Sequence, residues 1–168
     1  MSYFASLLPW DCYTPVLMSY AIEVRKAPVR IQGVRGDGFA AEVFLHSARP
    51  HDPGVEAVSD RLNSGEEQFL PCQTETGVSL VRLDAIAYLE CLDPSRELTR
   101  MDEVGASKVG VEMELATGEH LTGELLCQLP EGRRVSDYLN TDESRFLLLI
   151  EDSRVLFINK NAIDRITE

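Results

Sequence analysis

Apolar and polar residues alternate along most of the chain with the two-residue period of β-strands. In the C-terminal third, every second residue between positions 109 and 115 is apolar, a turn follows around Gly118, and the alternation then resumes. This pattern is typical of a β-hairpin. A tight turn at residues 151–153 separates two more apolar segments. The expected strands of this region cover residues 109–115, 121–129, 145–150, 154–159 and 162–167.

The chain contains this unit twice. Residues 58–91 align with residues 135–168 at an offset of 77 without a gap, and 11 of the 34 aligned positions are identical. Upstream, with small gaps, residues 41–43 align with residues 123–125. A fixed offset over this length indicates duplication of one structural unit. The expected domains are an N-terminal segment at 1–20, repeat 1 at 21–91, a connector at 92–105 and repeat 2 at 106–168.

Five short strands with sharp turns bury a common core best by curling into a small barrel. The predicted fold class is therefore all-β with short helical turns, a tandem duplication of a small five-stranded Sm-like or SH3-like barrel. The connector begins with Asp93-Pro94-Ser95 and continues without Gly or Pro up to Val104. A capping residue followed by Pro predicts one short helix between the repeats.

A polar turn recurs in both repeats and is the strongest candidate interaction site. It reads Val58-Ser-Asp-Arg-Leu-Asn63 in repeat 1 and Val135-Ser-Asp-Tyr-Leu-Asn140 in repeat 2, where two arginines precede it. Such groups could hold a carboxylate, a phosphate or a base edge. The structural alternative is that Ser or Asp caps the turn, Leu fills the core and Asn140 takes a left-handed exit. The candidate interaction residues are Arg133, Arg134, Ser136, Asp137, Tyr138, Asn140, Ser59, Asp60 and Asn63.

Two resemblances rest on these positions. Repeat 2 resembles the Sm-like fold through Gly118, Gly123-Glu-Leu125, Asp137-Tyr-Leu-Asn140 and the closing segment at 157–163. An insertion at 130–136 lengthens the loop that this family uses for uridine binding, so the RNA function does not follow directly. Residues 134–140 also resemble uncharacterised bacterial small-barrel domains with an Arg-(Leu/Val)-Ser-Asp-(Tyr/Phe)-Leu-Asn signature. That resemblance implies a fold and a bacterial cytosol, but no activity.

The 168-residue chain is acidic throughout. It carries 16 Lys and Arg residues against 28 Asp and Glu residues, a net charge of −12 at pH 7. Repeat 1 has seven basic and 11 acidic residues, and residues 109–168 have six and 12. Because an acidic surface repels phosphate backbones and anionic lipid, the composition argues against nucleic acid or a membrane surface as the partner.

The cysteines and the N-terminal residues indicate a cytoplasmic protein. Cys12, Cys72, Cys91 and Cys127 stand singly, which favours small buried residues in a reducing compartment over a disulfide framework or a zinc site. No apolar stretch approaches the roughly 20 residues of a membrane span. No basic segment precedes the apolar positions near the N-terminus, so we expect no signal peptide.

Three other features favour structural roles. Arg35-Gly36-Asp37 lies between two apolar alternations and predicts a hairpin turn. His46, His51 and Asp52 might suggest a metal, but two histidines in a Pro-rich loop with no third strong ligand do not make a site, so we expect no metal and no cofactor. The paired acids Glu66-Glu67 and Asp142-Glu143 come between a turn and a strand, where a solvated rim is expected. Without a catalytic constellation, we expect that the chain is not an enzyme.

One strand differs strongly between the repeats. Residues 146–150 are apolar on both faces, whereas the counterpart at 69–73 contains Pro71 and ends polar. A strand buried on both faces must be covered on its outer side, by repeat 1, by the N-terminal segment or by another chain. Pro71 cannot donate to a ladder, so its strand is expected at an edge or a bulge.

These features together favour a non-catalytic protein-interaction or assembly module. Its partner would be another protein or a second copy, and contact would use an apolar face or strand addition at an edge. A single-stranded RNA-binding protein using Arg133, Arg134 and Tyr138 is one alternative. The other is a small-molecule sensor using the loop at 47–57.

Overall fold

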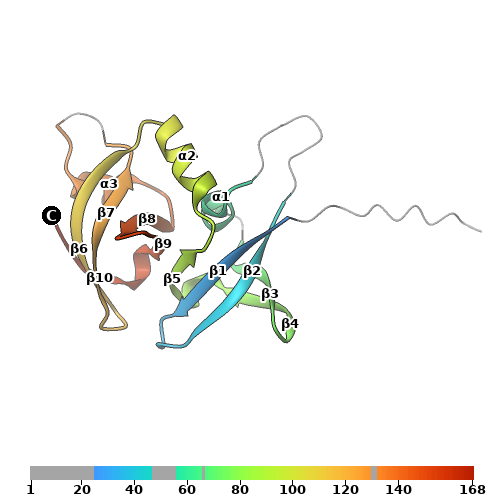
Figure 1. Ribbon diagram of the computed structural model, residues 1–168. Helices are drawn as coiled ribbons and strands as arrows, with labels where there is room; N and C mark the ends of the chain where they lie inside the picture. Colours follow the sequence, from blue (N-terminus) through green and yellow to red (C-terminus); the bar gives the residue numbers. More distant parts are fainter. Residues whose placement is uncertain (1–24, 47–55, 66, 130–131) are drawn as a thin grey trace, which may run out of the picture.

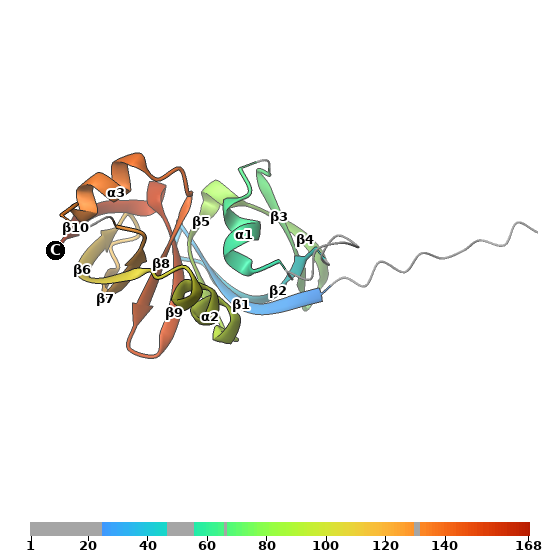
Figure 2. The same cartoon turned by 90° about the horizontal axis from the view of Figure 1, so that it is seen from above.

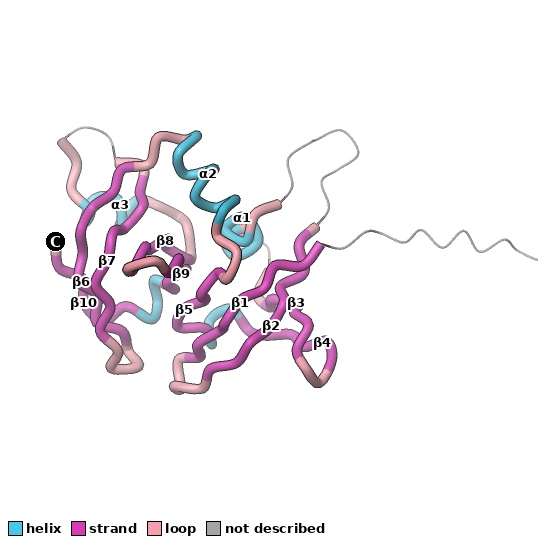
Figure 3. The backbone as a smooth tube through the Cα atoms, in the orientation of Figure 1, coloured by secondary structure: helices cyan, strands magenta, loops and turns pink. Residues whose placement is uncertain are grey.

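The protein is built from strands with three short helices between them (Figures 1 and 3). The computed structural model describes residues 25–46, 56–65, 67–129 and 132–168. Repeat 1 contains β1 (Arg25–Gly33), β2 (Gly38–Leu45), α1 (Val58–Asn63), β3 (Phe69–Thr74), β4 (Gly77–Arg82) and β5 (Ile86–Cys91). The connector folds as α2 (Ser95–Glu103). Repeat 2 contains β6 (Ser107–Leu115), β7 (His120–Cys127), α3 (Val135–Thr141), β8 (Phe146–Glu151), β9 (Arg154–Asn159) and β10 (Ile163–Thr167).

All ten strands belong to one antiparallel sheet, in the order β10-β6-β7-β8-β9-β5-β1-β2-β3-β4. Each repeat contributes the same internal order, with its fifth strand beside its first and its fourth strand at the far side. The mostly β character expected from the sequence is confirmed. The expectation of two closed barrels is wrong, because the sheet does not close. The fourth strand of repeat 2, β9, pairs instead with the fifth strand of repeat 1, β5.

The pairing of β5 with β9 joins the two repeats, which lie side by side in Figures 1 and 2. The ladder pairs Tyr88 with Ile158, Leu89 with Phe157, Glu90 with Leu156 and Cys91 with Val155. We call this ladder, with the side-chain contacts around it, the inter-repeat joint. Through this ladder, the five strands of repeat 1 and the five strands of repeat 2 form one continuous open sheet.

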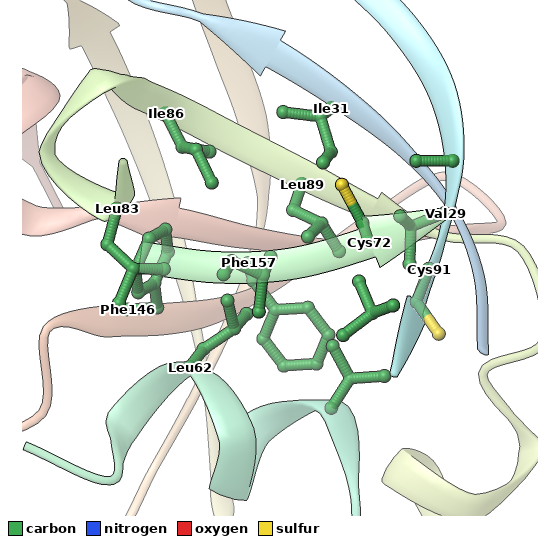
Figure 4. Packing of buried hydrophobic residues seen from close by; sticks show 14 of the residues in the cluster. Val29, Ile31, Leu62, Cys72, Leu83, Ile86, Leu89, Cys91, Phe146 and Phe157 are labelled. Atoms are coloured by element: carbon green, nitrogen blue, oxygen red, sulfur yellow. The ribbon is translucent and has the colours of Figure 1, made fainter. Parts of the chain in front are cut away.

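The hydrophobic core has two parts, and each part takes side chains from both repeats. The first fills repeat 1 but also receives Phe146, Leu148, Val155 and Phe157 from the outer faces of β8 and β9. Figure 4 shows Phe146 and Phe157 in this core, near Leu62 and Leu83 of repeat 1. The second fills repeat 2 and receives Ala87 and Tyr88 from β5. Leu147 and Leu149 face the second part, so β8 is buried on both faces. The cover that the sequence requires for this strand is therefore repeat 1.

Three of the four cysteines serve as small core residues, as expected. Cys72, Cys91 and Cys127 are buried and unpaired. Burial raises the pKa of the Cys91 thiol to about 11 and also raises the pKa of Cys72 and Cys127. These thiols therefore stay protonated near neutral pH and react slowly. Cys12 lies outside the described residues.

β3 is not the last strand of the sheet, but at Pro71 it is paired on one side only, so the edge expected at this position is local. β3 pairs with β2 and with β4, and Pro71 faces Leu80 of β4. The pairing of β3 with β2 is, however, restricted to Glu42 with Gln73 and Val43 with Cys72. Pro71 lies beyond this short ladder, where its missing N–H removes no bond to β2.

The turns follow from local chemistry. Arg35-Gly36-Asp37 lies in the β1–β2 hairpin turn, as expected, with Gly36 at a φ of 85°. In α1 and α3 the aspartate in the third helical position accepts from the backbone N–H of the residue before the helix. The expected left-handed exit at Asn140 is wrong: Asn140 lies within α3, and Asp152 is the one non-glycine residue with positive φ in the described ranges.

None of the helices described is both long enough and apolar enough to span a membrane.

Candidate functional site

The repeated turn of repeat 1 is occupied by contacts within the chain. Ser59 Oγ donates to Glu97 Oε2 (2.7 Å), and the Val58 N–H donates to Glu97 Oε1 (2.6 Å). Glu97 belongs to α2 and is buried. Asp60 accepts from the Ala57 N–H (3.1 Å) and pairs with Arg100 of α2. Ser59 and Asp60 therefore fix α2 against α1 and are not available to a ligand.

Asn63 binds the backbone of the other repeat. Its Nδ2 donates to the Phe146 carbonyl (3.1 Å), and its Oδ1 accepts from the Phe146 N–H (2.8 Å). Asn159 is fully buried on the same joint and donates to the carbonyls of Leu83 (3.1 Å) and Ile86 (2.9 Å). Each bond connects one repeat to the other. These two amides therefore add side-chain hydrogen bonds to the backbone ladder of the joint.

The turn of repeat 2 is more open. Arg133, Arg134, Ser136 and Asn140 are exposed, and Asn140 Nδ2 donates to the Ser136 carbonyl (2.8 Å). Asp137 is half-buried and accepts from the Arg134 N–H (3.2 Å). Among the described residues, the turn of repeat 2 has no counterparts of Glu97, Arg100 and Phe146, which bind the turn of repeat 1.

Tyr138 is half-buried beside Asp142. Burial, and then the charge of Asp142, raise the pKa of its hydroxyl well above the usual value. Asp142 in turn pairs with Lys160 (3.3 Å). A phenol in this setting stays neutral, and its ring is partly covered by the protein. The structure therefore places the two exposed arginines before α3 but leaves the aromatic ring that the RNA alternative needs partly buried.

A cavity of about 240 Å³ between the repeats brings three of the candidate residues together. Ser59, Asn63 and Tyr138 line it, with Asp142 and Phe157 among their neighbours. The other candidates, Arg133, Arg134, Ser136, Asp137, Asn140 and Asp60, do not line it. Because the polar groups of Ser59 and Asn63 are already bonded within the chain, the cavity is explained as part of the inter-repeat joint.

Several of the remaining polar candidates have partners within the chain. His46 contacts Arg61, which pairs with Glu67 (2.8 Å). His51, Asp52 and Glu66 lie outside the described residues, as does most of the loop at 47–57. In the described ranges no group of three His, Cys, Asp or Glu side chains could hold a metal ion.

The sequence reasoning missed an apolar surface at the end of the sheet. Val78 and Leu80 of β4 are each 68% exposed, and Phe69 of the neighbouring β3 is 49% exposed. We call these three side chains the edge face. Their aligned counterparts in repeat 2 are Val155, Phe157 and Phe146, which are all buried in the joint. The alignment shows apolar residues at all three positions in both repeats, but it does not show which of the two sets is exposed.

The edge face borders unpaired backbone. β4 is the last strand of the sheet, and β10 is the last strand at the opposite end. Among the described residues no strand pairs with the outer side of either one. Figure 1 shows β4 and β10 at opposite ends of the molecule.

Comparisons of the chain with protein-family models, with curated proteins and with solved structures find no match.

Proposed function

We propose that the chain is a non-catalytic protein-interaction module that binds an extended protein segment by strand addition at β4. The bound segment would pair antiparallel with β4, and its apolar side chains would cover Val78, Leu80 and Phe69. Main-chain hydrogen bonds supply affinity in this mode, and alternate side chains supply specificity.

The observation that carries the proposal is the inter-repeat joint itself. At the joint, β9 receives β5 as a partner strand, and Val155 and Phe157 become buried beneath the other repeat. β4 is the aligned strand of repeat 1. It has apolar residues at the same two positions, Val78 and Leu80, but among the described residues no strand pairs with its outer side. An exposed edge strand with an apolar face is prone to pair with another chain.

Two lysines on the edge face test the proposal. The variant Val78→Lys/Leu80→Lys places charges where apolar contact is needed, and lysine blocks pairing at sheet edges. Wild type and variant would each select from a displayed library of random linear peptides. We expect wild type to enrich peptides with apolar residues at alternate positions, and the variant to retain them about tenfold less well or worse.

The chain offers a matched control. Leu92 and Val104 are also exposed apolar residues, 48% and 46% exposed, but they lie outside β4. The variant Leu92→Lys/Val104→Lys adds the same two charges and should retain the peptides as wild type does. Equal retention by all three proteins would contradict strand addition at β4.

A further inference from the structure

We propose that the strand added to β4 is β10 of a second copy of this chain, so that copies associate head to tail. This inference rests on the proposed function and names its partner. The inter-repeat joint pairs the fourth strand of one repeat with the fifth strand of the other. β4 and β10, whose outer sides pair with no strand in the part of the chain that the structure describes, are a fourth strand and a fifth strand.

The offset of 77 residues transfers the register of the joint to this contact. Leu89 pairs with Phe157 inside the chain, and the aligned residues are Ile166 and Leu80. Glu90 pairs with Leu156, and the aligned residues are Thr167 and Ser79. The complete expected ladder is Arg165 with Val81, Ile166 with Leu80, Thr167 with Ser79, and Glu168 with Val78.

The surface beside β10 has the side chains to receive the edge face. In the joint, Leu62 of α1 and Leu89 of β5 belong to the core that takes up Phe146 and Phe157. Their aligned residues in repeat 2 are Leu139 and Ile166, which are apolar and half-buried. Ile163, aligned with buried Ile86, is also half-buried. A second copy would therefore cover apolar surface on both partners.

A polar contact is also repeated. Asn63 binds both backbone groups of Phe146 across the joint, and the aligned residues are Asn140 and Phe69. Asn140 is exposed and donates to the Ser136 carbonyl within its own helix. On association its amide would turn from Ser136 to the backbone of Phe69 in the next copy. Asn140 thereby acquires the role that Asn63 has inside the chain.

Polar substitutions make the contact between copies weaker than the joint. Arg82 stands where the joint has Asn159, whose amide donates to Leu83 and Ile86. Leu83 and Cys91 lie in the shared core, and their aligned residues are Lys160 and Glu168. Lys160 is held by Asp142, and Glu168 accepts from the Val135 N–H (3.0 Å). The polar replacements reduce the apolar area that can be buried. We therefore expect association that depends on protein concentration, in contrast to the permanent joint.

A head-to-tail contact uses different surfaces on the two partners, so each copy retains one free end after pairing. Such contacts continue until they close into a ring or extend as a filament. The expected product is therefore a species larger than a dimer. A symmetric dimer that uses the same strand on both copies would contradict the inference.

Paired cysteines test the register directly. One protein carries Ser79→Cys and the other Thr167→Cys, both with Cys12→Ser and with Cys72→Ala, because Cys72 lies opposite position 79 within the chain. The remaining cysteines are buried. Opposite residues on antiparallel strands lie close enough for a disulfide. After mixing and mild oxidation at high protein concentration, we expect a disulfide between positions 79 and 167, identified by peptide mass. Sedimentation velocity of the wild type should show larger species as concentration rises.

The control shifts the register by two residues. Pairing Ser79→Cys with Arg165→Cys keeps the same side of the strand, and it should give about tenfold less cross-linked product. Equal yields from the two pairs, or a wild type that remains monomeric at every concentration, would overturn the inference. If that happens while Val78→Lys/Leu80→Lys still abolishes peptide selection, the identity of the partner fails and the proposed function stands. If both tests fail, the proposed function fails as well.

Discussion

Replacing Phe157 with alanine is expected to lower the free energy of unfolding by about 3–5 kcal/mol. Phe157 comes from β9 of repeat 2 but lies in the core that fills repeat 1, where it is 1% exposed. Its removal leaves a cavity among Leu62, Leu89 and Phe146, which adds to the loss of apolar burial. Because the core is shared, both repeats should lose stability in one transition.

Leu80→Ala is the matched control for this variant. Leu80 occupies the aligned position in repeat 1 and is 68% exposed, so its truncation should change the stability of the dilute protein by less than about 0.5 kcal/mol. Urea unfolding followed by circular dichroism, at a concentration where the chain is monomeric, measures both effects. Similar losses for Phe157→Ala and Leu80→Ala would show that the two aligned positions do not differ in burial as described.

Replacing Gly123 with alanine is expected to cost about 1–3 kcal/mol, because the new methyl group meets the backbone of the neighbouring strand. Gly123 lies in β7, and a Cβ there would approach the Ile150 carbonyl carbon to 3.0 Å and Glu151 Cα to 3.2 Å. Backbone atoms inside a sheet cannot rotate away as a side chain can. The ladder between β7 and β8, which pairs Glu124 with Ile150, should therefore be displaced.

Repeat 1 carries alanine at the aligned position, Ala41, beside the shorter ladder between β2 and β3. The control is Gly110→Ala in β6, where a Cβ would meet nothing within 4 Å. This variant should stay within about 0.5 kcal/mol of wild type. Thermal unfolding of the three proteins compares them, and an equal loss for Gly110→Ala would show that general strand effects, and not the close approach of β8, are responsible.

The duplication, the β character and the short polar turns could be predicted from the sequence because they are local or repeated patterns. Alternation fixes which residues share a face, and Gly36 and Gly118 mark the turns of two hairpins. The apolar strand at 146–150 also indicated that its outer face is covered. What covers it could not be predicted, since repeat 1, the N-terminal segment and another chain would each satisfy the same pattern.

Barrel closure could not be predicted correctly because it depends on pairing between distant strands. β9 had two candidate partners of the same chemistry, β10 in its own repeat and β5 in the other. The pattern of apolar residues does not distinguish them. The buried amide of Asn159, which donates to Leu83 and Ile86, favours the pairing across repeats, but this contact links positions that are more than 70 residues apart.

The candidate interaction residues, too, could be predicted only in part. The turn pattern identified Ser59, Asp60 and Asn63 as candidates for binding a partner. In the structure these side chains instead bind α2 and β8 of the same chain. The edge face was missed because a single alternating strand looks the same whether its apolar side is covered or open. Comparing Val78 and Leu80 with the burial of Val155 and Phe157 reveals it.

The central claim, that the end strands repeat the inter-repeat joint between chains, is tested most directly by hydrogen–deuterium exchange of the wild type at low and high protein concentration. We expect the amides of β5 and β9 to be protected at both concentrations, and those of residues 78–81 and 165–168 to gain protection at the high concentration. Protection that is unchanged along β4 and β10, or that increases in other strands instead, would contradict the claim.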